Sequence, residues 1–388
     1  MPCPLYLPAK PIAMEFRYLH SISEISAQQW DSLVHSDYPF TRHAFLAALE
    51  LSGSVTVATG WQPHHLCVYQ AEQLVAVMPL YIKQHSYGEY IFDWSWAEAY
   101  QRHGYNYYPK LLAAIPFTPA TGPRLCIHPD SDTAALYEAV GQELIAQAQQ
   151  LQASSIHVLY HSQANHFNAP FMARSSVQFH WFNQGYTCFD DFLAQFKSRK
   201  RKTLNKERRS VKQQGISLQR LSGKEINEEI WQQFYYFYQL TYAKRSGHGG
   251  YLKQDFFKRI ASSMAEQIML VIARKDQRII AGALNFFDSH SLYGRYWGCS
   301  EELEQLHFEA CYYQGIEFCI ERGLQRFDSG AQGEHKIQRG FQPVDTHSSH
   351  WLAQPDFAHA IQQFLQQETA ELKRYKQQCS EYLPFKGT

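Results

Sequence analysis

Two segments of this chain repeat each other, and the repeat limits what the chain can fold into. EISAQQW (24–30) and EINEEIW (225–231) share Glu, Ile and Trp at the same spacing, and each follows a short Leu/Ser stretch. Each is followed by an apolar strand, a short polar turn and a second apolar strand, which begin at Leu66 and at Val271. We therefore expect two copies of one unit of helix, helix and hairpin.

The two predicted hairpins align without a gap. When Leu66 is set on Val271, the apolar run 74–76 falls on the apolar run 279–281. One such match could arise by chance, but the same elements in the same order at nearly the same separation favour a duplication.

The second copy is clear enough to assign its elements in order. Helices are predicted at 226–243 and 252–266, strands near 268–274, 279–287 and 291–297, a helix at 307–322 that ends at Gly323, strands at 324–328 and 348–353, and a long amphipathic helix at the end of the chain. A mixed, mostly antiparallel sheet flanked by helices is the expected architecture, of the α/β or α+β class. The expected domains are residues 14–190 and 191–388.

Composition supports two globular domains. The chain has 388 residues, 45% of them hydrophobic and 19% charged, which excludes collagen-like, coiled-coil and disordered classes. Aromatic residues reach 15%, and many stand beside polar ones, as in DWSWAEAY (93–100) and QFYYFYQL (233–240). Such segments can line deep, partly hydrated clefts. The net charge of zero predicts no general attraction to nucleic acid or membrane.

The sequence predicts a soluble, cytoplasmic protein. Its first twenty residues contain no uninterrupted apolar core of a signal peptide, and no run of eighteen apolar residues occurs. The eight cysteines are scattered without a CxxC pair, so we expect reduced thiols. Nineteen histidines are present, but no HExxH or similar spacing predicts a metal site.

Several long and compositionally unusual strings carry a resemblance to a known family. They are SYGEYIFDWSWA (86–97), YYPKL (107–111), PFTPATGPR (116–124), YGRYWG (293–298), HFEACYYQGIEF (307–318) and GAQGEHKIQRGF (330–341). The sequence resembles the FemAB-like family of predicted N-acyltransferases, often labelled peptidoglycan-biosynthesis-like, over nearly its whole length.

The resemblance implies a fold and an activity. The fold would be two tandem GNAT-like domains, and the activity would be transfer of an acyl or aminoacyl group to the amine of a small molecule or peptide. Acyl-CoA or aminoacyl-tRNA would be the co-substrate, without a further cofactor. Neither a Q/RxxGxG/A pyrophosphate loop nor a long coiled-coil arm is visible, so the sequence leaves the donor open. It also leaves the oligomeric state open.

The segment SLYGRYWGC (291–299) is the expected donor strand. The resemblance implies that the amide-rich arm of the donor pairs with a splayed edge of this strand, which makes Tyr293, Gly294 and Arg295 candidate donor-binding residues. Gly294 and Gly298 leave room for a close approach. The alternative is a β-bulge in a packed sheet.

The segment FDSGAQGEHKIQRGF (327–341) is the expected anion-binding loop. Gly330 and Gly333 follow a predicted strand and allow backbone N–H groups to face outward, and Lys336 and Arg339 follow them closely. These four residues are candidate donor-binding residues. The spacing matches neither a Walker loop nor GxGxxG.

The same loop supplies the candidate catalytic residues. Glu334 or His335 could act as the base that removes a proton from the amine, and Asp328 ends the preceding strand at the edge of a cleft. The alternatives are a loop held by a Glu–Lys or Glu–Arg pair and an Asp328 that caps a turn. Loops carry function disproportionately, which favours the catalytic interpretation.

Charged residues among aromatic rings in the first half predict an acceptor pocket. Glu89, Asp93, Lys110 and Arg124 are the candidates, because charges are costly to bury unless they are paired, and clefts hold such pairs. Internal salt bridges that hold the two copies together are the alternative.

The basic segment FKSRKRKTLNKERRSVK (196–212) predicts a helix at 195–214 that opens the second domain. Nine of its residues are Lys or Arg and only Glu207 is acidic. The helix could attract RNA, CoA phosphates or another polyanion. The alternative function is a non-catalytic nucleic-acid-binding protein that keeps the fold and uses residues 197–212. Contact with tRNA is compatible with this function and with the N-acyltransferase. A basic face that is only solvated is the third interpretation.

Overall fold

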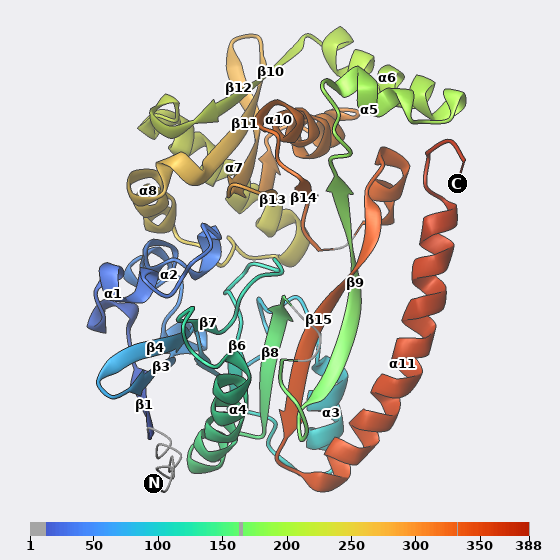
Figure 1. The fold of residues 1–388 in the computed structure, drawn as a ribbon. Helices are drawn as coiled ribbons and strands as arrows, with labels where there is room; N and C mark the ends of the chain where they lie inside the picture. The colour runs from blue at the N-terminus through green and yellow to red at the C-terminus, as the bar shows by residue number, and fades with distance from the viewer. Residues whose placement is uncertain (1–12, 163–165, 332, 388) are drawn as a thin grey trace, which may run out of the picture.

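The computed structural model describes residues 13–162, 166–331 and 333–387. Figure 1 shows two lobes, with the first half of the chain mainly in the lower lobe and the second half mainly in the upper one. Within the described ranges, no helix combines the length and the apolar character needed to cross a membrane.

The lower lobe contains two groups of strands and four helices. A small antiparallel sheet has the order β1-β3-β4-β7, and a second group continues the large sheet in the order β8-β6-β5-β2. Its strands are β1 (Met14–Leu19), β2 (Trp61–Pro63), β3 (His65–Gln70), β4 (Gln73–Met78), β5 (Tyr81–Lys83), β6 (Lys110–Ala113), β7 (Cys126–Ile127) and β8 (Ser155–His161), and its helices are α1 (Ala27–Asp31), α2 (His43–Leu51), α3 (Trp94–Arg102) and α4 (Thr133–Gln150).

The upper lobe is built on the strand order β10-β11-β12-β13-β14. Its strands are β10 (Ile216–Ser222), β11 (Ile268–Lys275), β12 (Arg278–Phe287), β13 (Ser291–Cys299) and β14 (Arg326–Asp328), and its helices are α5 (Phe189–Ala194), α6 (Ser198–Gln213), α7 (Glu228–Ser246), α8 (Gln254–Ser263), α9 (Leu306–Phe308) and α10 (Gln314–Arg322). A π-helical segment, Glu309–Tyr313, joins α9 to α10. Helix α10 ends as expected at Gly323, whose φ of +69° is left-handed.

Two long strands join the lobes into one sheet of eleven strands. β9 (Met172–Phe182) pairs with β14 above, and β15 (Gln342–Leu352) lies between β9 and β8. Helix α11 (Pro355–Glu381) packs along β9 and β15 on the right of Figure 1. A strand from the second half of the chain therefore completes the sheet of the first half. The division of the chain into two domains between residues 190 and 191 stays a prediction.

The hairpins confirm the predicted repeat at the level of single residues. The pairing of β3 with β4 shifts between Val68 and Tyr69, and the pairing of β11 with β12 shifts between Ala273 and Arg274. These are the positions that coincide when Leu66 is set on Val271. Both turns also use two residues with positive φ, 71–72 and 276–277. The mixed α/β fold with two copies of one unit is therefore as expected.

The repeated EI motif positions a helix in each copy. In the first copy the Ser26 side chain accepts a hydrogen bond from the backbone N–H of Gln29, and in the second the Asn227 side chain accepts one from that of Ile230. Each satisfies an N–H that the first helical turn leaves free. The similarity between the copies therefore includes the signal that starts α1 and α7.

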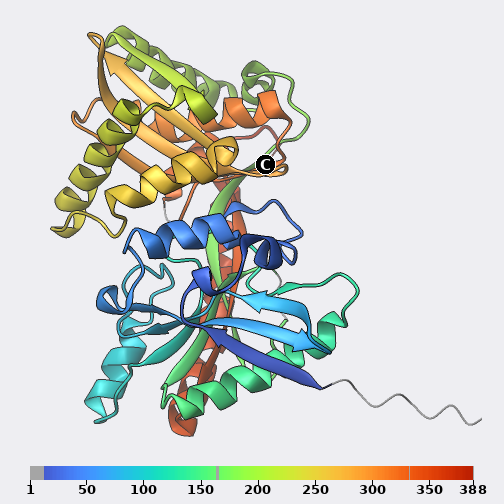
Figure 2. The ribbon, with the colours of Figure 1, turned by 90° about the vertical axis from the view of Figure 1, so that its left-hand side faces the viewer.

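The lobes share part of one hydrophobic core. Helix α2 packs against α8, and the Phe45 and Phe256 rings meet at 5.7 Å between centroids. Phe40 packs against Phe45 and against Phe286 of β12. Aromatic rings that meet edge to face bury large apolar areas, so this contact fixes the lobes relative to each other. Figure 2 shows α2 next to the upper lobe.

Strands β13 and β14 part from each other after a short parallel pairing. They pair only through 291–293 and 326–328, after which β14 ends while β13 continues to Cys299. Among the residues that the structure describes, no strand pairs with the edge of β13 that faced β14 from Gly294 onward. Alternate N–H and C=O groups along such an edge are available to a ligand.

Gly298 of β13 allows α7 to pass close to the sheet. A Cβ atom there would lie 2.2 Å from the carbonyl oxygen of Phe237, a contact that backbone cannot relieve without moving. We expect Gly298→Ala to lower the free energy of unfolding by about 1–3 kcal/mol, as overpacking does. Chemical denaturation measures the change, with Gly249→Ala as control, because a Cβ at Gly249 meets only ordinary contacts. Equal stabilities for the two variants would contradict the packing argument.

Candidate functional site

A cleft of about 630 Å³ opens between the lobes where β13 and β14 part. Its back is formed by 294–297 of β13 and by the loop that follows β14, from Ser329 to Lys336. Residues of the 86–94 segment form the lower wall, and residues of α7 form the upper one. The volume lies in the range of small-molecule sites. Both halves of the chain are therefore needed to make the cleft.

The charged side chains that line this cleft are all cationic. They are Arg245, Arg295 and Lys336, with His307 and His335 beside them, and no Asp or Glu lies among the described lining residues. A cleft with this lining favours anionic or neutral groups, since an added cation would find no carboxylate there.

Aromatic residues form most of the remaining wall, and the sequence predicted that segments mixing aromatic and polar residues line a cleft. Eleven rings line the cleft: Tyr87, Tyr90, Phe92, Trp94, Phe117, Tyr238, Tyr242, Tyr251, Tyr296, Trp297 and Tyr312. Two strings of mixed aromatic and polar residues, 93–100 and 233–240, contribute Trp94 and Tyr238. The mixed composition of these strings was the signal that located them.

The glycine-rich loop, for which the sequence predicted a donor-binding role, lies at the back of the cleft. Gly330 and Gly333 both have left-handed φ, at +90° and +113°. The buried Lys336 donates hydrogen bonds to the carbonyl oxygens of Gly330 at 2.7 Å and Ser329 at 3.3 Å. Burial lowers the pKa of Lys336 to about 8. The Lys336 ammonium therefore holds the loop through the backbone carbonyls. Because its N–H groups are used in this way, Lys336 interacts less strongly with a bound anion.

The two candidate bases of the loop lie on different sides of it. His335 lines the cleft, and its Nε2 lies 2.9 Å from the Tyr312 hydroxyl. Partial burial, together with the Lys336 and Arg339 charges, lowers the pKa of His335, so the ring is neutral at pH 7. Glu334 instead accepts a hydrogen bond from Tyr375 of α11 at 2.7 Å and does not line the cleft.

Arg339 joins the loop to the basic helix α6. Its Nη2 donates to both carboxylate oxygens of Glu207 at 2.9 Å, and its guanidinium lies 3.4 Å from the centre of the Phe308 ring. Lys200 adds a hydrogen bond to Gln338. Arg339 is therefore paired and lies outside the cleft, while α6 is fixed against the back of the loop.

Arg295, Asp328 and Tyr293 lie at the base of the cleft, where β13 and β14 part. Arg295 Nη2 lies 2.9 Å from Asp328 Oδ2, and each side chain is about 1% exposed. Arg295 lines the cleft. Tyr293 points away and donates to Asp288 at 2.8 Å. The β12–β13 register shift after Leu284 makes Arg295 the extra residue of a bulge, so the bulge and the cleft occur together.

Three of the four predicted acceptor residues form a buried ionic cluster behind the lower wall. Lys110 donates to Glu89 and to Ser86, both at 2.8 Å, and to Asp93. Only Ser86 of these lines the cleft. Burial alone would raise the pKa of Asp93, but the Lys110 ammonium holds it well below its usual range. The cluster anchors the 86–94 segment from behind.

Arg124 is placed apart from that cluster. Its guanidinium donates to the backbone carbonyls of Leu159 at 2.7 Å and Ala120 at 2.6 Å, and the side chain is buried. It therefore ties the 116–124 segment to β8.

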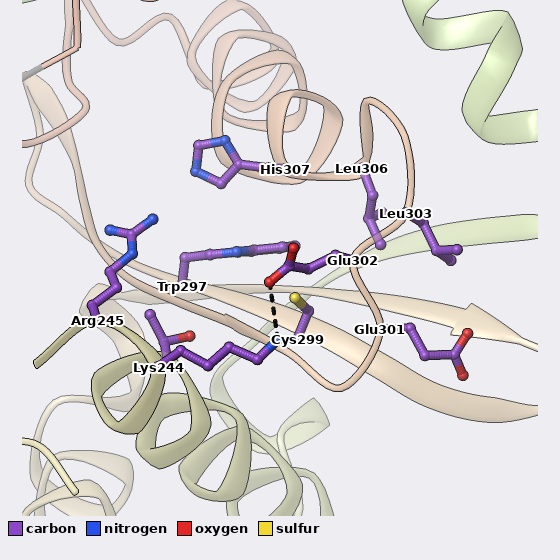
Figure 3. Close-up of a pocket in the computed structure, with 10 residues that line it drawn as sticks. Lys244, Arg245, Trp297, Cys299, Glu301, Glu302, Leu303, Leu306 and His307 are labelled. Atoms are coloured by element: carbon purple, nitrogen blue, oxygen red, sulfur yellow. Dashed lines mark hydrogen bonds and ion pairs between the residues drawn. The ribbon is translucent and has the colours of Figure 1, made fainter. Parts of the chain in front are cut away.

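A smaller pocket of about 370 Å³ adjoins the cleft beyond Trp297 (Figure 3). Arg245 and His307 border both spaces, and Lys244 and Glu302 form an ion pair of 2.9 Å within the smaller one. Burial lowers the pKa of His307 to about 4. Two acidic residues, Glu301 and Glu302, line this pocket, which makes it electrically mixed in contrast to the cleft.

In the described ranges, no group of three His, Cys, Asp or Glu side chains is arranged to hold a metal ion. Seven cysteines there are free thiols, and Cys3 lies outside those ranges.

The family model described as FemAB-like, peptidoglycan biosynthesis or recognition, matches residues 21–387. The chain belongs to the FemAB-like family. Among solved structures, FemX aligns with a TM-score of 0.53 and 13% identity over 89% of this chain and 100% of its own. The C-terminal domain of a lysylphosphatidylglycerol synthetase described as putative, from Agrobacterium fabrum, aligns with a TM-score of 0.53 and 10% identity. The alignment covers 88% of this chain and 96% of that domain. No curated protein sequence matches. At these identities the structural likeness shows a shared fold.

Proposed function

We propose that this FemAB-like protein is a transferase that joins an activated acyl or aminoacyl group to an amine within the interlobe cleft. The observation that carries the proposal is the parting of β13 and β14, which opens a cleft beside an unpaired strand edge and a glycine-rich loop. Membership of the FemAB-like family and the shared fold with FemX support it.

The cleft favours the reactive form of the amine. Arg245, Arg295 and Lys336 line it, and the Asp328 carboxylate behind its base is already ion-paired with Arg295, so the net positive environment disfavours an ammonium ion and lowers the pKa of an entering amine. A neutral amine has the lone pair that attacks a carbonyl carbon. His335, neutral at pH 7, is the group placed to take the proton that the amine then loses.

The donor class is part of the proposal. The pocket beside the cleft is lined by Glu301 and Glu302 as well as by Lys244 and Arg245, so it offers the phosphates of CoA no net positive charge. The exposed side of α6 carries Arg199, Lys202 and Lys206, and α6 is fixed to the loop by Arg339 and Lys200. These features favour an aminoacyl-tRNA over an acyl-CoA, because a polyphosphate backbone can follow such a face.

The experiment is a transfer assay with the full chain. Labelled acyl-CoAs and charged tRNAs are incubated separately with a panel of amines, at low and at high salt, and amide product is identified by mass spectrometry. We expect product from charged tRNA that declines as salt rises. Product from acyl-CoA alone would overturn the donor assignment. Absence of amide from every donor, with salt-dependent RNA binding retained, would favour the non-catalytic nucleic-acid-binding function.

Transfer should decline in alkaline solution because of Lys336. Its ammonium carries the hydrogen bonds to the loop carbonyls, and its pKa of about 8 means that this charge is lost as pH rises through that value. We expect the pH–rate profile of the wild type to fall above about pH 8, as a group that is needed in its protonated form requires. Lys336→Met should be slow and lack this decline. A decline that persists unchanged in Lys336→Met would exclude Lys336 as its cause.

A further inference from the structure

The base of the cleft holds polar groups that the protein itself leaves unsatisfied. Within the described residues, Arg295 Nε and Nη2, Asp328 Oδ2 and Ser329 Oγ are all buried without a hydrogen-bond partner. Arg295 and Ser329 line the cleft. An unsatisfied buried polar group destabilises the folded chain, because it has lost its hydrogen bonds to water without gaining others. Several of them together, at one end of a cleft, indicate a place that a ligand completes.

Arg295 and Asp328 form an ion pair, but no hydrogen bond joins the two side chains. Nη2 and Oδ2 lie 2.9 Å apart, yet neither atom makes a hydrogen bond, so the N–H is not aimed at the oxygen. Asp328 Oδ1 accepts a hydrogen bond from the backbone N–H of Gly330 at 2.8 Å, and His180 Nε2 lies 3.8 Å from it. One oxygen of Asp328 therefore accepts a hydrogen bond from the protein, and the other lies beside Arg295 without a hydrogen bond.

The backbone explains why these two side chains meet here. Arg295 is the extra residue of the β13 bulge, and Asp328 is the last residue of β14. Bulges redirect side chains and are frequent beside active sites. The rings of Phe40 and Tyr293 lie 5.5 and 5.8 Å from the Arg295 guanidinium and hold it in an apolar frame.

Free N–H donors beside a free carboxylate oxygen are complementary to an amide, which offers a carbonyl oxygen and an N–H side by side. We infer that Arg295 and Asp328 form the dyad that holds the reacting atoms of N-acyl transfer. Arg295 Nε and Nη2 hold the carbonyl oxygen of the acyl group, and Asp328 Oδ2 accepts an N–H of the attacking amine. The inference rests on the proposed function and names the residues that touch the reacting atoms.

The step balances with the groups present. The amine lone pair attacks the acyl carbon, a C–N bond forms, and the C=O electron pair moves to oxygen as an oxyanion beside Arg295. His335 takes the proton that the nitrogen loses. The oxyanion then re-forms C=O, the bond to the leaving oxygen or sulfur breaks, and His335 returns the proton to that leaving group.

Because Arg295 and Asp328 have different roles, their variants should differ in which reaction they slow, amide formation or donor hydrolysis. The oxyanion forms whether an amine or a water molecule attacks, so Arg295→Met should slow both amide formation and donor hydrolysis by about 10²–10³-fold. Asp328→Asn should slow amide formation by about 10²-fold, as misplacement of a reactant does, and leave donor hydrolysis near its wild-type rate. Amide formation at wild-type rate in either variant would overturn the inference.

A merely structural role is distinguished by two further variants. Removing one member of a buried ion pair can unfold a protein, so the double variant Arg295→Met/Asp328→Leu replaces both charges with apolar side chains of similar size. We expect it to fold and to lack amide formation. Arg220→Met removes a partner of Glu321 at the outer strand β10 and should not separate hydrolysis from amide formation. A folded double variant with wild-type transfer would overturn the dyad.

A binding experiment tests the dyad without turnover. N-methylacetamide is titrated into ¹⁵N-labelled full-length protein, and the Arg295 Nε–H signal is assigned by its loss in Arg295→Lys. The expected result is a saturable shift of this signal that is absent in Asp328→Asn. No shift of the Arg295 signal would overturn the dyad, whereas failure of the proposed function shows independently as no amide product from the wild type.

Discussion

Lys110→Met should lower the free energy of unfolding by about 3–5 kcal/mol, because it leaves two buried carboxylates without their main cation. The Lys110 ammonium is fully buried and contacts both Glu89 and Asp93. The remaining cation, Lys83, lies 3.8 Å from Glu89. Burial and proximity to Asp93 raise the pKa of Glu89 to about 7, although the Lys110 and Lys83 charges oppose this rise. Chemical denaturation of the full chain measures the loss.

Lys376→Met is the matched control for this loss. Lys376 also makes an ion pair, with Asp345, but both side chains are more than a third exposed, and solvent-exposed pairs contribute little. We expect its unfolding curve to overlay that of the wild type. If Lys110→Met were as stable as Lys376→Met, the cluster would not anchor the 86–94 segment.

His335→Ala should slow amide formation by about 10²–10⁴-fold, the usual contribution of a general base. The ring lines the cleft, and its pKa is lowered by partial burial and by the charges of Lys336 and Arg339. A base must be neutral to accept a proton, so on the acid side wild-type transfer should fall as pH drops below the ordinary histidine pKa of about 6.5. Transfer assays across pH, with the donor that the screen identifies, measure both effects.

Glu334→Gln is the control for His335→Ala in the same loop. Its carboxylate bonds to Tyr375 on α11 and lies outside the cleft, so we expect transfer within about twofold of wild type, as for surface changes without a role in the reaction. Added imidazole should partly restore His335→Ala. A large loss in Glu334→Gln together with wild-type transfer in His335→Ala would reverse the assignment of the base.

Local signals in the sequence were sufficient to predict the elements of the second half. The start of a helix in EINEEIW, the short polar turn of the 271–287 hairpin and the C-cap at Gly323 all lie where the sequence predicts them. Each depends on neighbours within a few residues, and short-range backbone chemistry decides such features. The repeat was detectable for the same reason.

The sequence indicated the loop of the site but not the side on which each residue lies. His335 and Lys336 line the cleft, whereas the neighbouring Glu334 and Arg339 turn toward α11 and α6. A short 3-10 helix, Glu334–Arg339, distributes these side chains around its axis. Only the elements packed on each side decide which of them meets the cleft.

By itself the sequence determined the duplicated unit, the strand and loop that form the back of the cleft, and the basic helix. The tertiary structure decided three things: β15 inserts between β9 and β8, the aromatic segments of both halves face each other across the cleft, and the Glu89–Lys110 cluster is buried behind one wall. These depend on contacts between residues far apart in the chain, which no local pattern encodes. The physical reason is that a charged side chain acts differently in solvent and in the interior. A solvent-exposed charge contributes little to stability, whereas a charge that is buried with a partner of opposite sign holds its segment in place.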